Sequence, residues 1–173
     1  MEETARNRDR VLTAVGELCT GCIMCQLVCS LTKTGRVNPY MARIGMAHRE
    51  EDLSYSPVIC RHCKNPTCEA SCPIPGAMTR DDSGVVTVDE ERCIGCLVCV
   101  EACPFGAIRV GTGREILKCD LCGGDPICVR YCPSRVIYSP SEPLPWPQRS
   151  CLQFVEPHRL AFVRGQKNRP GRK

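Results

Sequence analysis

Sixteen of the seventeen cysteines in this 173-residue chain fall into four blocks of four, and this pattern is typical of metal binding. The first and third blocks have the spacing C-x2-C-x2-C-x3-C. The second and fourth keep the same two ends around a longer middle. The blocks are Cys19, Cys22, Cys25 and Cys29; Cys60, Cys63, Cys68 and Cys72; Cys93, Cys96, Cys99 and Cys103; and Cys119, Cys122, Cys128 and Cys132.

The spacing favours [4Fe–4S] clusters, in which each of four iron corners takes one thiolate. Three cysteines two residues apart wrap three corners of a cube, and Gly21 and Gly95 allow such a loop to turn sharply. The fourth cysteine faces away from its own loop and ligates the other cube in two-cluster ferredoxins. Prolines at 73, 104 and 133 follow it in three blocks and fix the exit of the chain.

Zinc and disulfides are the alternatives to iron–sulfur clusters. All-thiolate zinc sites also use C-x2-C pairs, but they draw two pairs from separated segments and have no use for a third cysteine two residues further on. Disulfides are disfavoured because the charged residues 1–10 leave no room for a signal peptide before Cys19, which predicts a cytoplasmic protein. No apolar run approaches the roughly 18 residues of a membrane span. Cys151 is left over and is predicted to be a free thiol.

Short strands and helices are predicted to position these loops. Apolar runs predict strands over 11–15, 77–79, 85–88, 108–110 and 116–118, with hairpin turns at 81–84 and 111–113. Within the long insertion 30–59, which could cover the clusters or contact a partner, residues 40–47 are a further candidate strand. Helices of about two turns should follow each cysteine loop, since the prolines end them.

The segment from 139 to 173 differs from the rest of the chain. It opens with SPSEPLPWPQ, which favours an extended chain, and after Glu156 it carries six basic and no acidic residues. Two interpretations stay open, a solvated end or an arm anchored on a partner by Trp146, Phe154 and Phe162. No nucleic-acid-binding motif accompanies the charge, so a nucleic-acid role is not expected.

The motifs CTGCIMCQLVC, CRHCKNPTCEASCP, ERCIGCLVCVEACPFGAI and LKCDLCGGDPICVRYCP together resemble the four-cluster iron–sulfur subunits of the dimethyl sulfoxide reductase and formate dehydrogenase type. This chain looks most like the small polyferredoxins paired with carbon monoxide dehydrogenase or with bacterial tungsten aldehyde oxidoreductases, the latter being preferred. It departs from the pattern at Ser30, which stands in place of a proline after the first block, and at CPIPGAM and CPSRVI.

The resemblance implies that outer blocks pair with outer and inner with inner. The implied ligand sets are Cys19, Cys22, Cys25 and Cys132; Cys119, Cys122, Cys128 and Cys29; Cys60, Cys63, Cys68 and Cys103; and Cys93, Cys96, Cys99 and Cys72. The expected fold is α+β, with two pseudo-symmetric ferredoxin-like modules in residues 1–138 and an irregular docking tail over 139–173. Module A combines blocks 19–29 and 119–132, and module B combines blocks 60–72 and 93–103.

An electron-transfer subunit with four [4Fe–4S] clusters and no catalytic site of its own is the leading hypothesis. The implied partner is a catalytic molybdenum- or tungsten-type oxidoreductase subunit. A flavin subunit, a ferredoxin or further copies of this chain are candidates on the other side. The alternatives are an assembly scaffold with structural clusters and a free-standing polyferredoxin.

Four residues beside the motifs have two open interpretations each. Arg61, Arg92 and Lys118 are either counter-charges to buried clusters or ordinary surface charge. His62 is either a hydrogen-bond donor behind the ligands or a structural residue.

Overall fold

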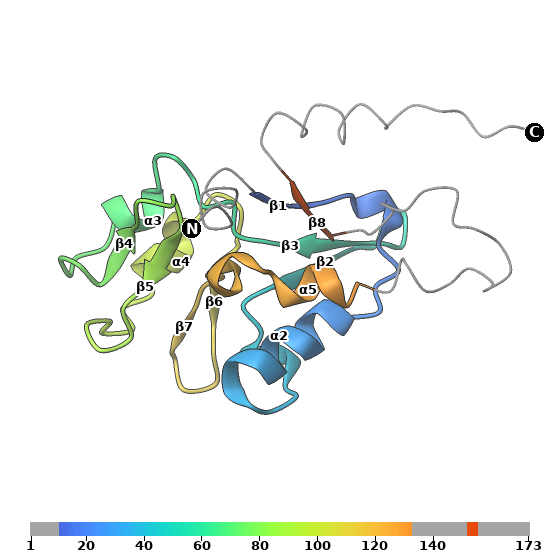
Figure 1. Ribbon diagram of the computed structural model, residues 1–173, viewed down its shortest axis with the longest axis horizontal. Coiled ribbons are helices and arrows are strands. Elements are labelled where there is room, and N and C mark those ends of the chain that lie inside the picture. Colours follow the sequence, from blue (N-terminus) through green and yellow to red (C-terminus); the bar gives the residue numbers. More distant parts are fainter. Residues whose placement is uncertain (1–10, 133–151, 156–173) are drawn as a thin grey trace, which may run out of the picture.

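The computed structural model describes residues 11–132 and 152–155, which form short helices and small antiparallel sheets (Figure 1). The helices are α2 (Met24–Thr34), α3 (Thr67–Ala70), α4 (Val98–Ala102) and α5 (Ile127–Arg130), with 3-10 turns η1 (Gly16–Leu18), η2 (Pro39–Met41) and η3 (Leu121–Gly124). The strands are β1 (Val11–Ala14), β2 (Gly45–Arg49), β3 (Ser54–Val58), β4 (Met78–Arg80), β5 (Val86–Val88), β6 (Arg109–Val110), β7 (Ile116–Leu117) and β8 (Leu152–Val155).

The elements gather in two groups that lie side by side in Figure 1. One holds α2, α5 and the pairs β1–β8 and β2–β3, and the other holds α3, α4 and the pair β4–β5. The β6–β7 hairpin lies below the region where the two groups meet in Figure 1. All four strand pairs are antiparallel two-stranded sheets. The arrangement is α+β, as expected, while the pseudo-symmetry of two modules stays a prediction.

Two separate hydrophobic cores match the two groups of elements, and cysteines make up much of both. The first contains Leu12, Ala42, Ile44, Leu121 and Leu152 with cysteines of the first and fourth blocks. The second contains Met78, Val86, Ile108 and Ile116 with cysteines of the second and third blocks. The cysteine sites thus lie within the two hydrophobic cores. A small domain buries little apolar surface of its own, so its stability depends strongly on such sites.

The helices differ in length from the prediction of about two turns each. Helix α2 has 11 residues, because Ser30 and not a proline follows Cys29, and it ends only at Gly35, whose φ of 70° is left-handed. Helices α3, α4 and α5 have only four or five residues, and each stops before a Cys-Pro pair. A proline disfavours the α conformation of the residue before it, which explains why these helices are shorter than expected.

The predicted hairpin strands are confirmed, with small shifts at their ends. Met78 pairs with Val88 and Arg80 with Val86 around the 81–84 turn, and Arg109 pairs with Leu117. The strand predicted over 40–47 is wrong in its first half. Asn38 caps the 3-10 turn η2, with a proline at its first position, so the strand begins only at Gly45. Its partner β3 was not predicted, and Pro57 is tolerated in it because each strand of a two-stranded sheet is an edge strand.

Part of the C-terminal segment is regular, which corrects the expectation of an irregular tail. Residues 152–155 form β8, which pairs with β1 from Ala14–Leu152 to Val11–Val155 and closes the first core with the buried Leu152. The strand lies after the proline-rich stretch, where backbone amides are again free to pair. Trp146, Cys151, Phe162 and the side chain of Phe154 lie outside the described residues, so their predicted roles and the 1–138 and 139–173 boundaries stay predictions.

No helix in the described residues is long and apolar enough to cross a membrane. The cytoplasmic location stays a prediction.

Candidate iron–sulfur sites

The four cysteine loops share one backbone feature, a left-handed residue directly before the second cysteine. It is Gly21 (φ 68°), His62 (φ 44°), Gly95 (φ 65°) and Leu121 (φ 55°). Glycine adopts this conformation freely, whereas a side chain makes it costly. The first and third loops therefore have glycine at this position, as the sequence analysis expected. The second and fourth loops have a side chain there and a strained backbone.

The first group of thiols joins the first loop to the end of the fourth block. The pKa of Cys25 is raised to about 12, mainly by burial and then by the charges of Cys22, Cys132 and Cys19. These four are the set that the resemblance implied for one cube. Cys25 and Cys132 are buried, whereas Cys22 is exposed.

The second group joins the fourth loop to the end of the first block. Burial raises the pKa of Cys128, followed by the charges of Cys119, Cys29 and Cys122. Burial likewise raises the pKa of Cys119 to about 12, against a hydrogen bond from the backbone of Leu121. Helices α2 and α5, which carry Cys29 and Cys128, lie against each other and hold the two loops together.

The third group lines a hollow. Cys60, Cys63, Cys68 and Cys103 all face an empty space of about 340 Å³ that is partly open to solvent. His62 and Lys118 line the same hollow. Burial raises the pKa of Cys68, and the charge of Lys118 opposes that rise.

The fourth group lines a second hollow, of about 330 Å³, with Cys72, Cys93, Cys96 and Cys99. Every other residue that lines it is apolar. Burial raises the pKa of Cys99 to about 11, followed by the thiols of Cys93, Cys68 and Cys96. Ile94 lines this hollow and is nevertheless 65% exposed.

The four groups are neighbours in a fixed order. After burial, which is the larger cause each time, Cys25 contributes to the raised pKa of Cys128, Cys60 to that of Cys119, and Cys68 to that of Cys99. The first pair joins groups one and two, the next joins two and three, and the last joins three and four. Each group is therefore within electrostatic reach of the next.

All sixteen cysteines in the described residues are free thiols, with no disulfide among them. The same residues contain no set of three or more His, Cys, Asp or Glu side chains arranged to hold a single metal ion. Several sulfurs receive hydrogen bonds: Arg43 N–H donates to Cys29 Sγ (3.3 Å), Ala107 N–H to Cys103 Sγ (3.4 Å) and Leu121 N–H to Cys119 Sγ (3.5 Å). Such bonds favour thiolate over thiol.

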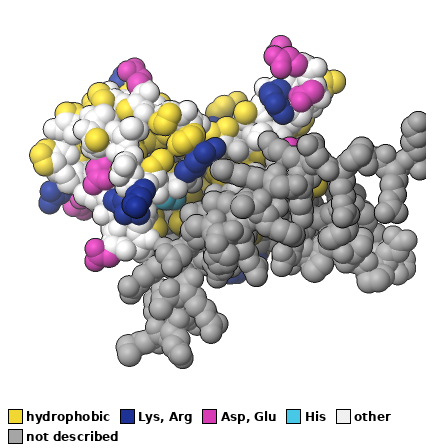
Figure 2. Space-filling view, turned by 90° about the horizontal axis from the view of Figure 1, so that it is seen from above, with side chains coloured by type: hydrophobic (Ala, Val, Ile, Leu, Met, Phe, Trp, Pro, Cys, Tyr) yellow, Lys and Arg dark blue, Asp and Glu magenta, His cyan; other side chains and the backbone are white. Residues whose placement is uncertain are grey.

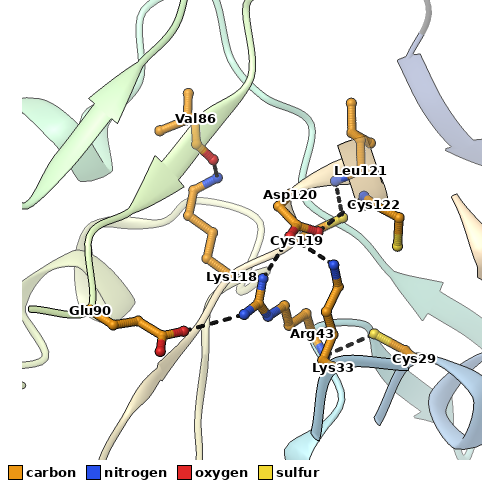
Figure 3. A network of polar contacts seen from close by, with 10 residues as sticks. All are labelled: Cys29, Lys33, Arg43, Val86, Glu90, Lys118, Cys119, Asp120, Leu121 and Cys122. Carbon is orange, nitrogen blue, oxygen red and sulfur yellow. Dashed lines mark hydrogen bonds and ion pairs between the residues drawn. The ribbon is translucent and has the colours of Figure 1, made fainter. Parts of the chain in front are cut away.

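A charged network braces the second group (Figure 3). Asp120 Oδ2 accepts hydrogen bonds from Lys33 Nζ (2.8 Å) and Arg43 Nη1 (2.9 Å), and Arg43 also reaches Glu90. Burial alone would raise the pKa of Asp120 and lower that of Lys33. The hydrogen bond and the opposite charges outweigh burial and shift both the other way. Asp120 Oδ1 also accepts from the backbone of Cys122 (3.0 Å), so the network fixes the fourth loop.

This network was missed by the sequence analysis. Asp120 lies inside the motif CDLC and Lys33 lies four residues after Cys29, one helical turn on. Charged residues this close to the cysteine loops were the signal in the sequence. The ion pair itself, however, joins residues 87 positions apart. The sequence alone could not identify these partners.

Lys118 is the one buried basic residue of the three considered above, with 3% of its surface exposed. Its Nζ donates to Cys60 Sγ (3.2 Å) and to the backbone oxygen of Val86, the second contact being visible in Figure 3. Arg61 and Arg92 are exposed, and the Arg61 guanidinium stacks on Phe105 at 4.0 Å. The prediction of a buried counter-charge is thus supported at Lys118, whereas Arg61 lines the same hollow from an exposed position and Arg92 does not line it.

His62 is fixed at one ring nitrogen and unpaired at the other. Val86 N–H donates to His62 Nδ1 (3.0 Å), while Nε2 is buried without a hydrogen-bond partner among the described residues. Burial, assisted by the positive charge of Lys118, lowers the pKa of His62 to about 4. The imidazole is therefore neutral at neutral pH.

Comparison with known proteins agrees with this geometry. The family described as 4Fe-4S dicluster domain matches residues 51–141, more than half of the chain. The polyferredoxin-like subunit of an aliphatic sulfonate oxidoreductase from Pyrococcus furiosus is 35% identical over 133 residues, covering 76% of each protein. The B subunit of anaerobic dimethyl sulfoxide reductase from Escherichia coli is 37% identical over 138 residues, covering 69% of this protein and 67% of that subunit. The beta subunit of an NADH-dependent phenylglyoxylate dehydrogenase from Aromatoleum evansii is 38% identical over 120 residues, which cover 66% of this protein and 26% of that subunit.

The protein belongs to the 4Fe-4S dicluster domain family. It is an iron–sulfur electron-transfer subunit that binds [4Fe–4S] clusters, similar to the iron–sulfur subunits of oxidoreductase complexes. The resemblance seen in the sequence to the dimethyl sulfoxide reductase type is confirmed.

Proposed function

We propose that the sixteen cysteines hold four [4Fe–4S] clusters in the four groups described above. The ligand sets are Cys19, Cys22, Cys25 and Cys132; Cys119, Cys122, Cys128 and Cys29; Cys60, Cys63, Cys68 and Cys103; and Cys93, Cys96, Cys99 and Cys72. The single observation that carries this proposal is that each of two hollows is lined by four cysteines of two different blocks, three from one loop and the fourth from the other block. A cube needs four thiolates around one space, which these hollows supply.

The order of the groups supports a path for electrons along the protein. When bound, the clusters supply one-electron transfer. Successive groups are near enough for the charge of one cysteine to raise the pKa of another, as in the pairs Cys25–Cys128, Cys60–Cys119 and Cys68–Cys99. The two exposed cysteines of the described residues, Cys22 and Cys96, belong to the two terminal groups. This suits entry of electrons at one end and exit at the other.

The partner that we propose is a catalytic oxidoreductase subunit of the molybdenum or tungsten type, with a tungsten aldehyde oxidoreductase preferred. Relatives named as subunits of sulfonate, dimethyl sulfoxide and phenylglyoxylate enzymes support a role beside a catalytic subunit. In this proposal the present chain is not catalytic itself. A flavin subunit, a ferredoxin or another copy of this chain takes the electrons at the far end.

The surface around the fourth group suits such a contact. Ile94, Val98 and Phe105 are exposed apolar side chains close in sequence to the exposed Cys96. In the view of Figure 2, acidic and basic side chains are scattered and not concentrated in one patch. Apolar contacts around an electron exit exclude water from the transfer path.

The experiment is to purify the protein anaerobically together with the proteins bound to it, and to add substrates of the co-purified catalytic subunit. Electron transfer predicts that substrate reduces the clusters of this chain and that an acceptor reoxidises them, followed by EPR. Clusters that dithionite cannot reduce and reoxidise reversibly would instead favour the assembly scaffold. Reversible clusters without any bound catalytic subunit would favour a free-standing polyferredoxin.

A further inference from the structure

The hollow of the third group differs from that of the fourth in polarity. Both are lined by four cysteines and have similar volumes, yet only the third is also lined by an imidazole and by cationic side chains, the exposed Arg61 and the buried Lys118. We propose that Lys118 and His62 are positioning residues that raise the reduction potential of the cluster held by Cys60, Cys63, Cys68 and Cys103. This inference rests on the proposed ligand sets.

Lys118 acts through a ligand. Its Nζ lies 3.2 Å from Cys60 Sγ, and the side chain is held there by a second hydrogen bond to the oxygen of Val86. A charge-assisted hydrogen bond to a ligating thiolate withdraws electron density from it. Adding an electron makes the cluster more negative, so a buried positive charge stabilises the reduced form more than the oxidised form.

The two acidic side chains whose charge acts on His62, Asp120 and Asp81, both have other partners. Asp120 influences the same region, but it is paired with both Lys33 and Arg43. Asp81 is near the surface and is engaged by Ser83 and by the backbone of Val85. Arg61 also lines the hollow, but it is exposed and stacks on Phe105, so Lys118 is the buried positive charge at the third group.

His62 acts by donating a hydrogen bond. Because Val86 N–H donates to Nδ1, that nitrogen carries a lone pair and the ring proton lies on Nε2. Nε2 is buried, and it has no acceptor among the described residues although His62 lines the hollow. A buried donor is rarely left unpaired in a folded protein. A sulfur of the bound cluster is the acceptor that completes it, and hydrogen bonds to cluster sulfur raise the potential.

The backbone holds His62 in a strained conformation, as it does Leu121 at the matching position of the fourth loop. His62 occupies the left-handed position that Gly21 and Gly95 fill in the first and third loops. Glycine there would relieve the strain of a φ of 44°, but it would remove the only imidazole that lines the hollow. The strain is thus retained together with a side chain that reaches the hollow.

The test is an EPR-monitored redox titration of the anaerobic holoprotein and of its variants. Lys118→Met and His62→Leu remove the two interactions. Lys64→Met is the matched control, because it removes an exposed positive charge from the same loop, where solvent screens it. Each test variant should lower one potential of the four, shifting that reduction equilibrium by about tenfold, or about 59 mV for one electron. His62→Gln, which can still donate, should restore part of the shift, and Lys64→Met should leave all four potentials in place.

The affected cluster is identified by Cys63→Ser, which should perturb the same EPR signal. Iron and sulfide content distinguishes a failure of the proposed ligand sets from a failure of the proposed effect on the reduction potential. A wild-type protein without about sixteen iron atoms contradicts the ligand sets. Variants that keep their iron but leave all four potentials unchanged, or move all four equally, contradict this inference alone.

A variant that loses its cluster still leaves a decisive measurement on the wild type. Histidine labelled with 15N should give a hyperfine coupling to one reduced cluster in pulsed EPR, and His48→Gln should retain it. Absence of any histidine coupling in the wild type would overturn the role of His62.

Discussion

Asp120 and Lys33 form an ion pair of 2.8 Å between the fourth cysteine loop and the end of helix α2, 87 residues apart in sequence. Cys122 follows Asp120 by two residues and Cys29 precedes Lys33 by four. The pair therefore holds together the two segments that supply the second ligand set. Arg43 contacts the same carboxylate oxygen, which makes Asp120 the centre of this contact.

Replacing Asp120 with asparagine should destabilise the holoprotein by about 1–3 kcal/mol, since Lys33 and Arg43 lose their partly buried partner. The measurement is the midpoint of cluster loss on heating, at a fixed scan rate without oxygen. Arg49→Gln is the control, because its pair with Asp52 is exposed and should contribute little.

The stabilisation that Asp120 contributes should depend on pH in a defined way. The pKa of Asp120 is held below its ordinary value, so its contribution to stability is fully present above about pH 4 and is lost only as the pH falls through the lowered pKa. The difference between wild type and Asp120→Asn should therefore be constant from about pH 5.5 to 8.5. A difference that changes within this range would assign the stabilisation to another group.

The ligand sets predict which cysteine variants resemble each other. Cys132→Ser and Cys22→Ser should perturb one EPR signal, whereas Cys29→Ser and Cys122→Ser should perturb another. The reason is that each set takes its fourth thiol from the other block of the pair. Cys151→Ser, which removes the unmatched thiol, should change no signal and no iron content. If Cys132→Ser perturbs the signal of Cys122→Ser, the exchange between blocks is wrong.

Two equivalent glycines should differ in their tolerance to alanine. Both are left-handed, so alanine costs roughly 1–2 kcal/mol of strain at either position. A Cβ at Gly95 would lie 3.4 Å from its nearest neighbour, whereas one at Gly21 would lie 2.5 Å from the ring of Tyr55. Gly21→Ala should therefore be the more destabilising substitution in anaerobic thermal denaturation.

The cause of that difference can be isolated with a double variant. In a Tyr55→Ala background, Gly21→Ala should cost no more than Gly95→Ala, because the clash is absent. An excess cost that persists without Tyr55 would show that the loop, and not the ring, resists the substitution.

Removal of iron should unfold the protein, because cysteines belong to both cores and ligation is part of the folding free energy. The measurement is far-ultraviolet circular dichroism and protease sensitivity after anaerobic treatment with a chelator. An apoprotein that still melts cooperatively would contradict this prediction.

The sequence predicted best what the cysteine spacing and the turn residues control locally. The hairpin over 78–88 follows from the Asp-Asp-Ser-Gly turn, and the short helices end where Cys-Pro pairs occur. The length of helix α2 was underestimated, because Ser30 in place of proline lets the helix continue past Cys29.

Contacts between distant segments were beyond sequence reasoning. The pairing of β1 with β8 joins residues about 140 positions apart, and no local pattern in either strand identifies the other. His62 and Lys118 stand beside cysteines in the sequence, but their burial, their shared contact with Val86 and the unpaired Nε2 depend on tertiary packing. The family resemblance supplied the exchange of ligands between blocks, which spacing alone did not.

Quantification of iron and acid-labile sulfide per polypeptide, combined with reductive titration of the same anaerobic sample, tests the central claim most directly. Four reversible clusters predict about sixteen iron and sixteen sulfide per polypeptide and about four electrons taken up and returned. Zinc in place of iron, the absence of sulfide, or cluster content that takes up no electrons would contradict the account.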